Sequence, residues 1–160
     1  MKGPDIMQLT TIPMESLAEL LAVQLDNGGF TRLVVTGNSM YPTLRHRRDA
    51  VNLVPVERAL RRGDLILYRR ENGQFILHRI VSKPKNDRFI CCGDNQWEKE
   101  PVTRQQVIAI VDGFVREGKA YAENDRTYRL WVGAWIFVFP LRRPLLALRR
   151  MLGRLRSRTR

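Results

Sequence analysis

The chain has 160 residues, of which 44% are hydrophobic and 28% are charged. This length and composition allow one globular domain with a buried core and exclude an intrinsically disordered chain. The net charge is +12, but residues 1–120 carry 18 Lys and Arg against 14 Asp and Glu, whereas residues 121–160 carry 10 Arg against two acidic residues. The basic character belongs mostly to the C-terminal tail, so we expect that tail, rather than the domain, to bind an anionic partner.

The first expected element is a short helix over residues 14–26, where leucines recur at helical spacing and Asn27 with two glycines ends the pattern. The sequence before it has neither the apolar core of a signal peptide nor the length of a spanning helix. Cys91 and Cys92 are adjacent, so they offer no disulfide framework, and free thiols favour a reducing compartment. We therefore expect a protein that is cytoplasmic or bound peripherally to a membrane, with no spanning segment.

Six apolar runs with short connections follow, and each is typical of a β-strand. They cover residues 30–36, 49–56, 64–70, 74–81, 88–94 and 107–116. An Asn-Gly turn between the third and the fourth run favours a tight hairpin. This spacing of strands and turns favours a coiled sheet or barrel over alternating strands and helices. The sequence therefore predicts a mainly β domain.

The character of the chain changes after residue 120. Residues 130–141 are twelve uncharged residues rich in aromatic side chains, too few for a helix that must span a bilayer, which needs about 20. Over residues 145–158, leucines fall on one side of an expected helix and arginines on the other. Such a basic amphipathic helix is typical of an interfacial anchor, so we predict that residues 130–160 bind an anionic membrane surface. The alternatives are packing of this helix on the domain or, third, binding of nucleic acid, which the lack of a recognised binding motif disfavours.

Three polar side chains stand where a catalytic site could be built. Ser39 follows Gly-Asn at the end of an apolar strand, His78 shares a strand face with two isoleucines, and Asp94 follows another strand, between a glycine and an asparagine. A serine hydroxyl needs a base within hydrogen-bond reach, a neutral imidazole is such a base, and a carboxylate can fix the imidazole tautomer. Each residue also has a purely structural interpretation, as a turn residue for Ser39 and Asp94 and as a buried core side chain for His78.

Two further polar residues are expected to be structural. His46 lies in a basic loop, and we expect it at the surface. Asp64 begins a strand after a glycine, so we expect it to form a turn or to pair with neighbouring arginines.

Three short motifs resemble those of the signal peptidase I family and its relatives with the LexA-like peptidase fold. Residues 37–44, Gly-Asn-Ser-Met-Tyr-Pro-Thr-Leu, are similar to the box that carries the nucleophile in those enzymes. Residues 61–81 resemble the next two boxes, and residues 92–95, Cys-Gly-Asp-Asn, resemble the last. The order of the motifs agrees, and the similarity covers residues 30–116. It implies a LexA-like peptidase domain over residues 1–120, followed by the tail over residues 121–160.

The resemblance also implies roles for individual residues. Ordinary bacterial signal peptidases and LexA-type proteins place a lysine as general base where this sequence has His78, which is similar to the endoplasmic-reticulum and archaeal type. Ser39 is then the nucleophile, His78 the general base and Asp94 the carboxylate that orients the imidazole. Backbone N–H groups near Ser39 would hold the oxyanion. Four neighbours are implied to shape the loop and the substrate cleft: Gly37, Asn38, Met40 and Pro42.

The implied activity is that of a serine endopeptidase that cleaves a signal- or leader-like peptide or preprotein, with no metal or cofactor. Members of the family usually carry an N-terminal spanning helix, and none is found here, so a leader peptidase of the cytosol or of a membrane surface is favoured over export-coupled processing. One alternative is a catalytically silent module of the same fold that binds peptides or membranes. Another is a self-cleaving LexA-like regulator, which is disfavoured because residues 1–33 are too short for a DNA-binding domain and contain no Ala-Gly.

Overall fold

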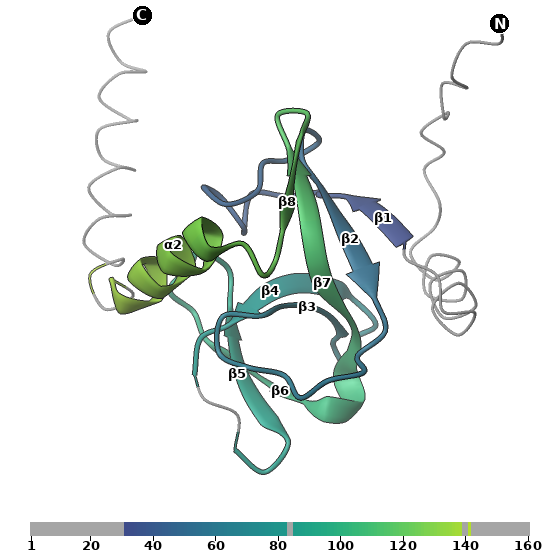
Figure 1. Ribbon diagram of the computed structural model, residues 1–160. Helices are drawn as coiled ribbons and strands as arrows, with labels where there is room; N and C mark the ends of the chain where they lie inside the picture. The colour runs from purple at the N-terminus through teal and green to yellow at the C-terminus, as the bar shows by residue number, and fades with distance from the viewer. Residues whose placement is uncertain (1–30, 83–84, 139–140, 142–160) are drawn as a thin grey trace, which may run out of the picture.

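A computed structural model of the protein describes residues 31–82, 85–138 and 141 (Figure 1). The helix expected over residues 14–26 and the amphipathic helix expected over residues 145–158 lie outside the described residues. The described chain is mainly β, as predicted, and holds eight strands, one short 3-10 helix and one α-helix.

Most strands are short, and one of ten residues runs through the middle of the sheet. In chain order the strands are β1 (Thr31–Val34), β2 (Ala50–Val54), β3 (Leu65–Arg69), β4 (Phe75–Ile80), β5 (Arg88–Cys92), β6 (Glu100–Thr103), β7 (Val107–Arg116) and β8 (Lys119–Ala122). The helices are η1 (Arg104–Gln106) and α2 (Arg126–Phe137). Six strands fall within the six apolar runs of the sequence, so these predictions are confirmed, whereas β6 and β8 were not predicted.

All strands pair antiparallel in one curled sheet, in the order β1-β2-β7-β3-β4-β5-β6, with β8 paired to β7 (Figure 1). The long strand β7 pairs with β2 along one part of its length and with β3 along the other. The register shifts between Asn52 and Leu53 on β2 and between Leu67 and Tyr68 on β3. Such irregularities increase the local twist, which helps the sheet to curl into a half-barrel.

The two faces of the sheet bury two apolar clusters. Strand β3 shows the division, because Leu65 and Leu67 belong to the first cluster, whereas Ile66 and Tyr68 belong to the second. The first cluster also contains Met40, from the loop that follows β1. That loop is therefore part of the folded core and not a free connection.

Helix α2 is packed on the domain. Its N-cap is Asp125, whose carboxylate accepts hydrogen bonds from the backbone N–H groups of Thr127 and Tyr128. Val132 and Ile136 are buried where the helix passes Gly63, since a Cβ on that glycine would lie 3.3 Å from Val132. The boundary expected after residue 120 thus falls inside β8, and residues 126–137, which the sequence assigns to the tail, contact the domain. Within the described residues, no helix is long and apolar enough to cross a membrane.

Candidate active site

Ser39 lies in the loop that follows β1. Buried apolar side chains of this loop hold it against the sheet. Met40 and Leu44 are buried in the first cluster, so the backbone that follows Ser39 is held against the sheet. Gly37 has a φ of 89°, a left-handed conformation that favours glycine, and its N–H donates to Nδ1 of His46 at 2.8 Å. Ser39 itself is half-buried, and its hydroxyl makes no hydrogen bond to another residue of the described chain. Within the described chain, the hydroxyl is therefore not held by a hydrogen bond.

The four loop residues implied to shape a cleft have different environments. Gly37 and Asn38 are exposed on the N-terminal side of Ser39. Met40 is only 1% exposed, and half-buried Pro42 follows a cis peptide bond. Met40 therefore anchors the loop in the core, and the exposed pair is better placed to meet a ligand.

A fully buried ion pair joins the second and the third motif. Arg79 donates from Nε to Oδ1 of Asp94 at 2.9 Å and from Nη2 to Oδ2 at 2.7 Å, and both side chains are 0% exposed. Thr43, from the first motif, donates its hydroxyl proton to Asp94 as well. The Nη1 atom of the arginine donates to the carbonyl of Gly63 at 2.8 Å and to the hydroxyl oxygen of Tyr128 at 3.2 Å. The two buried charges are thus neutralised and hydrogen-bonded, as burial requires.

The same pair brings all three motifs into one cluster. The backbone N–H of Asn95, next to Asp94, donates to the carbonyl of Ser39 at 2.7 Å. Arg79 is the chain neighbour of His78 on β4. The loop that carries Ser39 is therefore tied to the strand that carries His78. A direct hydrogen bond between Ser39 and His78 is not formed in the part of the chain that the structure describes.

A hydrogen-bond chain holds His78 on the opposite side of β4 from Arg79. Its side chain is 5% exposed, and Nδ1 lies 3.2 Å from the hydroxyl of Tyr68. That hydroxyl donates to Oε2 of Glu100 at 2.9 Å, and Arg70 binds the same carboxylate through two hydrogen bonds of 2.6 Å. Since the one hydroxyl proton of Tyr68 points to the carboxylate, Nδ1 of His78 carries the ring proton and donates to the Tyr68 oxygen. The other nitrogen, Nε2, keeps a free lone pair, as a general base requires.

Charges and burial set the protonation states of this chain. Burial lowers the pKa of His78 from 6.5 to about 4, while the charge of Glu100 raises it and that of Arg70 lowers it. The hydrogen bonds from Arg70 lower the pKa of Glu100, so this carboxylate is ionised. Burial, and next the contact with Glu100, raise the pKa of Tyr68, whose hydroxyl stays protonated. At neutral pH the three groups therefore have the states that the hydrogen-bond chain needs.

The residues that orient the imidazole differ from the one expected. The carboxylate of Asp94 faces Arg79, and within the described residues it shares no hydrogen bond with His78. Tyr68 and Glu100 occupy the orienting position instead, and neither was singled out from the sequence. The sequence could have indicated Tyr68, because a tyrosine in a buried strand needs a hydrogen-bond partner for its hydroxyl. No sequence pattern indicates Glu100, because nothing in its short segment predicts a strand.

The residues expected to be structural are placed as predicted. His46 is exposed, and Asp64 pairs with Arg58 at 2.8 Å. The thiol of Cys91 is buried, and burial raises its pKa to about 12, so it is not a reactive thiolate. Among the described residues, no group of three or more His, Cys, Asp or Glu side chains is placed to hold a metal ion.

Comparisons with known proteins add no further constraint. No protein-family model matches this sequence, and no curated protein is significantly similar to it.

Proposed function

We propose that the protein is a serine endopeptidase that cleaves signal- or leader-like peptides, with Ser39 as nucleophile and His78 as general base. The observation that carries the proposal is the hydrogen-bond chain from Glu100 through Tyr68 to His78, because it leaves Nε2 as the acceptor. In Ser-His-Asp enzymes a carboxylate fixes the tautomer by direct contact with the imidazole. Here a tyrosine hydroxyl stands between the two. The substrate class follows from the resemblance of the three motifs to the signal peptidase family.

The chemistry begins when Oγ of Ser39 attacks the peptide carbonyl carbon and Nε2 of His78 takes the hydroxyl proton. The proposal requires that substrate binding bring these two atoms into hydrogen-bond contact, because the described chain has no hydrogen bond between Ser39 and His78. Backbone N–H groups around Ser39 bind the tetrahedral oxyanion. The C–N bond then breaks as His78 passes its proton to the leaving amine. A water molecule, deprotonated by Nε2 of His78, then attacks the ester carbonyl carbon. The bond to Oγ of Ser39 breaks, the acid product leaves, and the imidazolium returns its proton to Oγ.

Asp94 acts in this proposal as a positioning residue. Its pairing with Arg79, together with the hydrogen bond from Asn95 to Ser39, holds the nucleophile loop at strand β4. The imidazolium formed during the reaction is stabilised by the negative charge of Glu100 and, to a smaller degree, by that of Asp94, since both charges raise the pKa of His78. In this proposal Asp94 mainly positions the loop of Ser39, and Glu100 mainly stabilises the charge of the imidazolium.

The pH dependence of cleavage tests the base directly. Because the neutral form of His78 persists down to a pKa of about 4, we expect kcat/KM to be level from neutral pH to about pH 5 and to fall by half near pH 4. Glu100→Gln is expected to lower the rate and to move the midpoint to lower pH, because the lost charge no longer raises the pKa of His78. Initial rates are measured over the range in which circular dichroism shows a folded protein.

Glu71→Gln is the matched control, because Glu71 is exposed in the hairpin between β3 and β4. It should leave both the rate and the midpoint unchanged. A wild-type midpoint near the ordinary histidine pKa of about 6.5 would contradict a buried neutral base. An unchanged midpoint in Glu100→Gln would contradict the role given to that carboxylate.

Gly93, in the third motif, lies against the loop that carries Ser39. A Cβ there would lie 2.7 Å from the carbonyl oxygen of Ser39 and 2.7 Å from Oε1 of Gln96. Gly93→Ala is therefore expected to displace Ser39 and to lower kcat by about tenfold or more, since catalysis depends on the position of the nucleophile. Steady-state kinetics measure kcat, and a normal kcat would show that the loop position does not matter.

A further inference from the structure

Helix α2 is apolar on two opposite sides. On its inner side, Val132 and Ile136 are buried against the domain. On its outer side, Leu130 and Phe137 lie two turns apart and are 75% and 85% exposed, and Leu141 beyond the helix end is 59% exposed. The outer side of a surface helix is normally polar. The outer side of α2 is therefore an apolar surface that no described residue covers.

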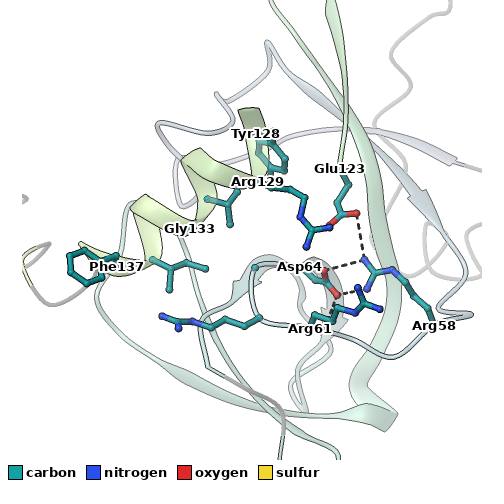
Figure 2. Close-up of a pocket in the computed structure, with 12 residues that line it drawn as sticks. Arg58, Arg61, Asp64, Glu123, Tyr128, Arg129, Gly133 and Phe137 are labelled. Atoms are coloured by element: carbon teal, nitrogen blue, oxygen red, sulfur yellow. Dashed lines mark hydrogen bonds and ion pairs between the residues drawn. The ribbon is translucent and has the colours of Figure 1, made fainter. Parts of the chain in front are cut away.

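A cavity of about 320 Å³ lies between α2 and the loop before β3 (Figure 2). Both walls contribute arginines, and the apolar wall of the helix closes one side. The arginines are Arg58, Arg61, Arg62 and Arg129. In Figure 2, Arg129 points from the helix toward the opposite wall, whereas Phe137 points away from the domain. A cationic cavity and an exposed apolar side chain thus occur at one end of the molecule.

The arginines of this cavity differ in their partners. Arg58 is bound by Asp64 at 2.8 Å and by Glu123 at 3.6 Å. The guanidinium groups of Arg61 and Arg129 make no hydrogen bond or ion pair with another residue of the described chain. Two cations therefore remain available to an anionic group that approaches the cavity.

We propose that the outer side of α2 and this cavity form a docking surface for an anionic lipid bilayer. Leu130, Phe137 and Leu141 enter the boundary between head groups and acyl chains, and the apolar contact supplies binding that does not depend on salt. Arg61 and Arg129 bind lipid phosphates at the level of the head groups. The apolar side chains on the outer side of α2, and the cavity arginines that have no partner among the described residues, complement a surface that presents phosphates above acyl chains.

The sequence that follows supports this choice of partner. Residues 142–160 contain eight Arg and no Asp or Glu, so the chain continues into a segment that an anionic surface attracts. The docking surface adds what that segment alone does not explain, namely a place in the folded domain where apolar and cationic groups meet. The proposal does not depend on peptidase activity, because vesicle binding is measured without a substrate.

The apolar part is tested with the full chain and sedimentation of vesicles made of phosphatidylcholine and phosphatidylglycerol. The double substitution Leu130→Ser with Phe137→Ser is expected to lower partitioning about tenfold or more. The loss should persist at high salt, because the removed contact is apolar. Val34→Ser, at a valine of β1 that is 37% exposed, is the matched control and should bind like the wild type. Thermal unfolding confirms that each variant is folded.

The cationic part is tested with Arg61→Gln combined with Arg129→Gln. This pair is expected to weaken binding to vesicles that contain phosphatidylglycerol by about tenfold at low salt, and to have little effect at high salt. Arg69→Gln combined with Arg104→Gln removes the same charge from exposed positions elsewhere and should have a smaller effect. Equal losses for the two pairs would show that only net charge matters and would overturn the phosphate site.

Other occupants of the surface give different results. If Leu130→Ser with Phe137→Ser binds vesicles like the wild type, the surface is not the lipid contact. Sedimentation velocity without lipid then shows whether the wild type forms a dimer that this variant loses, which would assign the surface to a second copy of the chain. Binding to a DNA duplex that depends on Arg61 and Arg129, without binding to vesicles, would likewise overturn the lipid assignment.

Discussion

Ser39→Ala is expected to lower the rate of peptide cleavage by about 10³-fold or more while the protein stays folded. The Ser39 hydroxyl is half-buried and makes no hydrogen bond to another described residue, so its removal breaks no hydrogen bond within the described chain. The rate falls because the attacking oxygen is gone. Wild type and variant are incubated with a library of leader-bearing peptides that have small side chains at P1 and P3, as the resemblance to signal peptidases implies. Mass spectrometry then quantifies the products.

The two histidines of the chain provide a matched pair for this experiment. His78→Gln should lose nearly as much activity as Ser39→Ala, whereas His46→Gln, at an exposed position, should keep most of it. Because nucleophile and base act as a unit, combining Ser39→Ala with His78→Gln should cost little more than either change alone. Absence of cleavage by both proteins would favour a catalytically silent peptide-binding module, whereas equal cleavage by both would show that Ser39 is not the nucleophile. A shortened chain in the wild-type sample alone would point to self-cleavage.

Asp94→Asn is expected to lower the free energy of unfolding by about 3–5 kcal/mol. Arg79 is 0% exposed, and Asp94 is its counter-charge. Asparagine has nearly the same size but no charge, so it leaves a buried cation without compensation. Urea denaturation at neutral pH measures the loss. Cleavage activity should fall as well, because the loop of Asp94 also positions Ser39.

A surface ion pair serves as the control for this stability loss. Glu117 pairs with Arg48, but its side chain is 62% exposed, so Glu117→Gln should cost less than about 1 kcal/mol. Replacing both buried partners, Arg79→Met with Asp94→Leu, should recover part of the loss, because no charge is then left buried. A loss below about 1 kcal/mol for Asp94→Asn would show that another group or water neutralises the arginine.

The sequence predicts those strands that bury an apolar run, and it does not predict those that exist only through pairing. Strand β8 is exposed along its whole length and is held by β7, and β6 contains Pro101 and is held by β5. Their residues carry no alternation of apolar and polar side chains that would mark a strand. Helix α2 was assigned to the tail for a similar reason, since its contact with Gly63 depends on the position of a distant turn.

The site residues show the same difference between what a local sequence pattern predicts and what depends on strand pairing. Ser39, His78 and Asp94 are visible in the sequence because each stands in a short motif. Their partners depend on strand register: Tyr68 comes beside His78 through the pairing of β3 with β4, and Glu100 through the pairing of β5 with β6. No local pattern encodes these registers. The role of Arg79 can be predicted in part, because an arginine among the apolar residues of a strand indicates that a buried counter-charge is needed.

The central position of β7 affects how this protein folds during its synthesis on the ribosome. β7 lies between β2 and β3 in the sheet, yet it follows both of them, and β4 to β6 as well, in the chain. The β1–β2 pair and the β3–β6 meander emerge first and present open edges on β2 and β3 until residue 116 has been added. Such edges attract other chains, so we expect translating ribosomes to hold a nascent chain that binds chaperones until β7 emerges and joins the two halves.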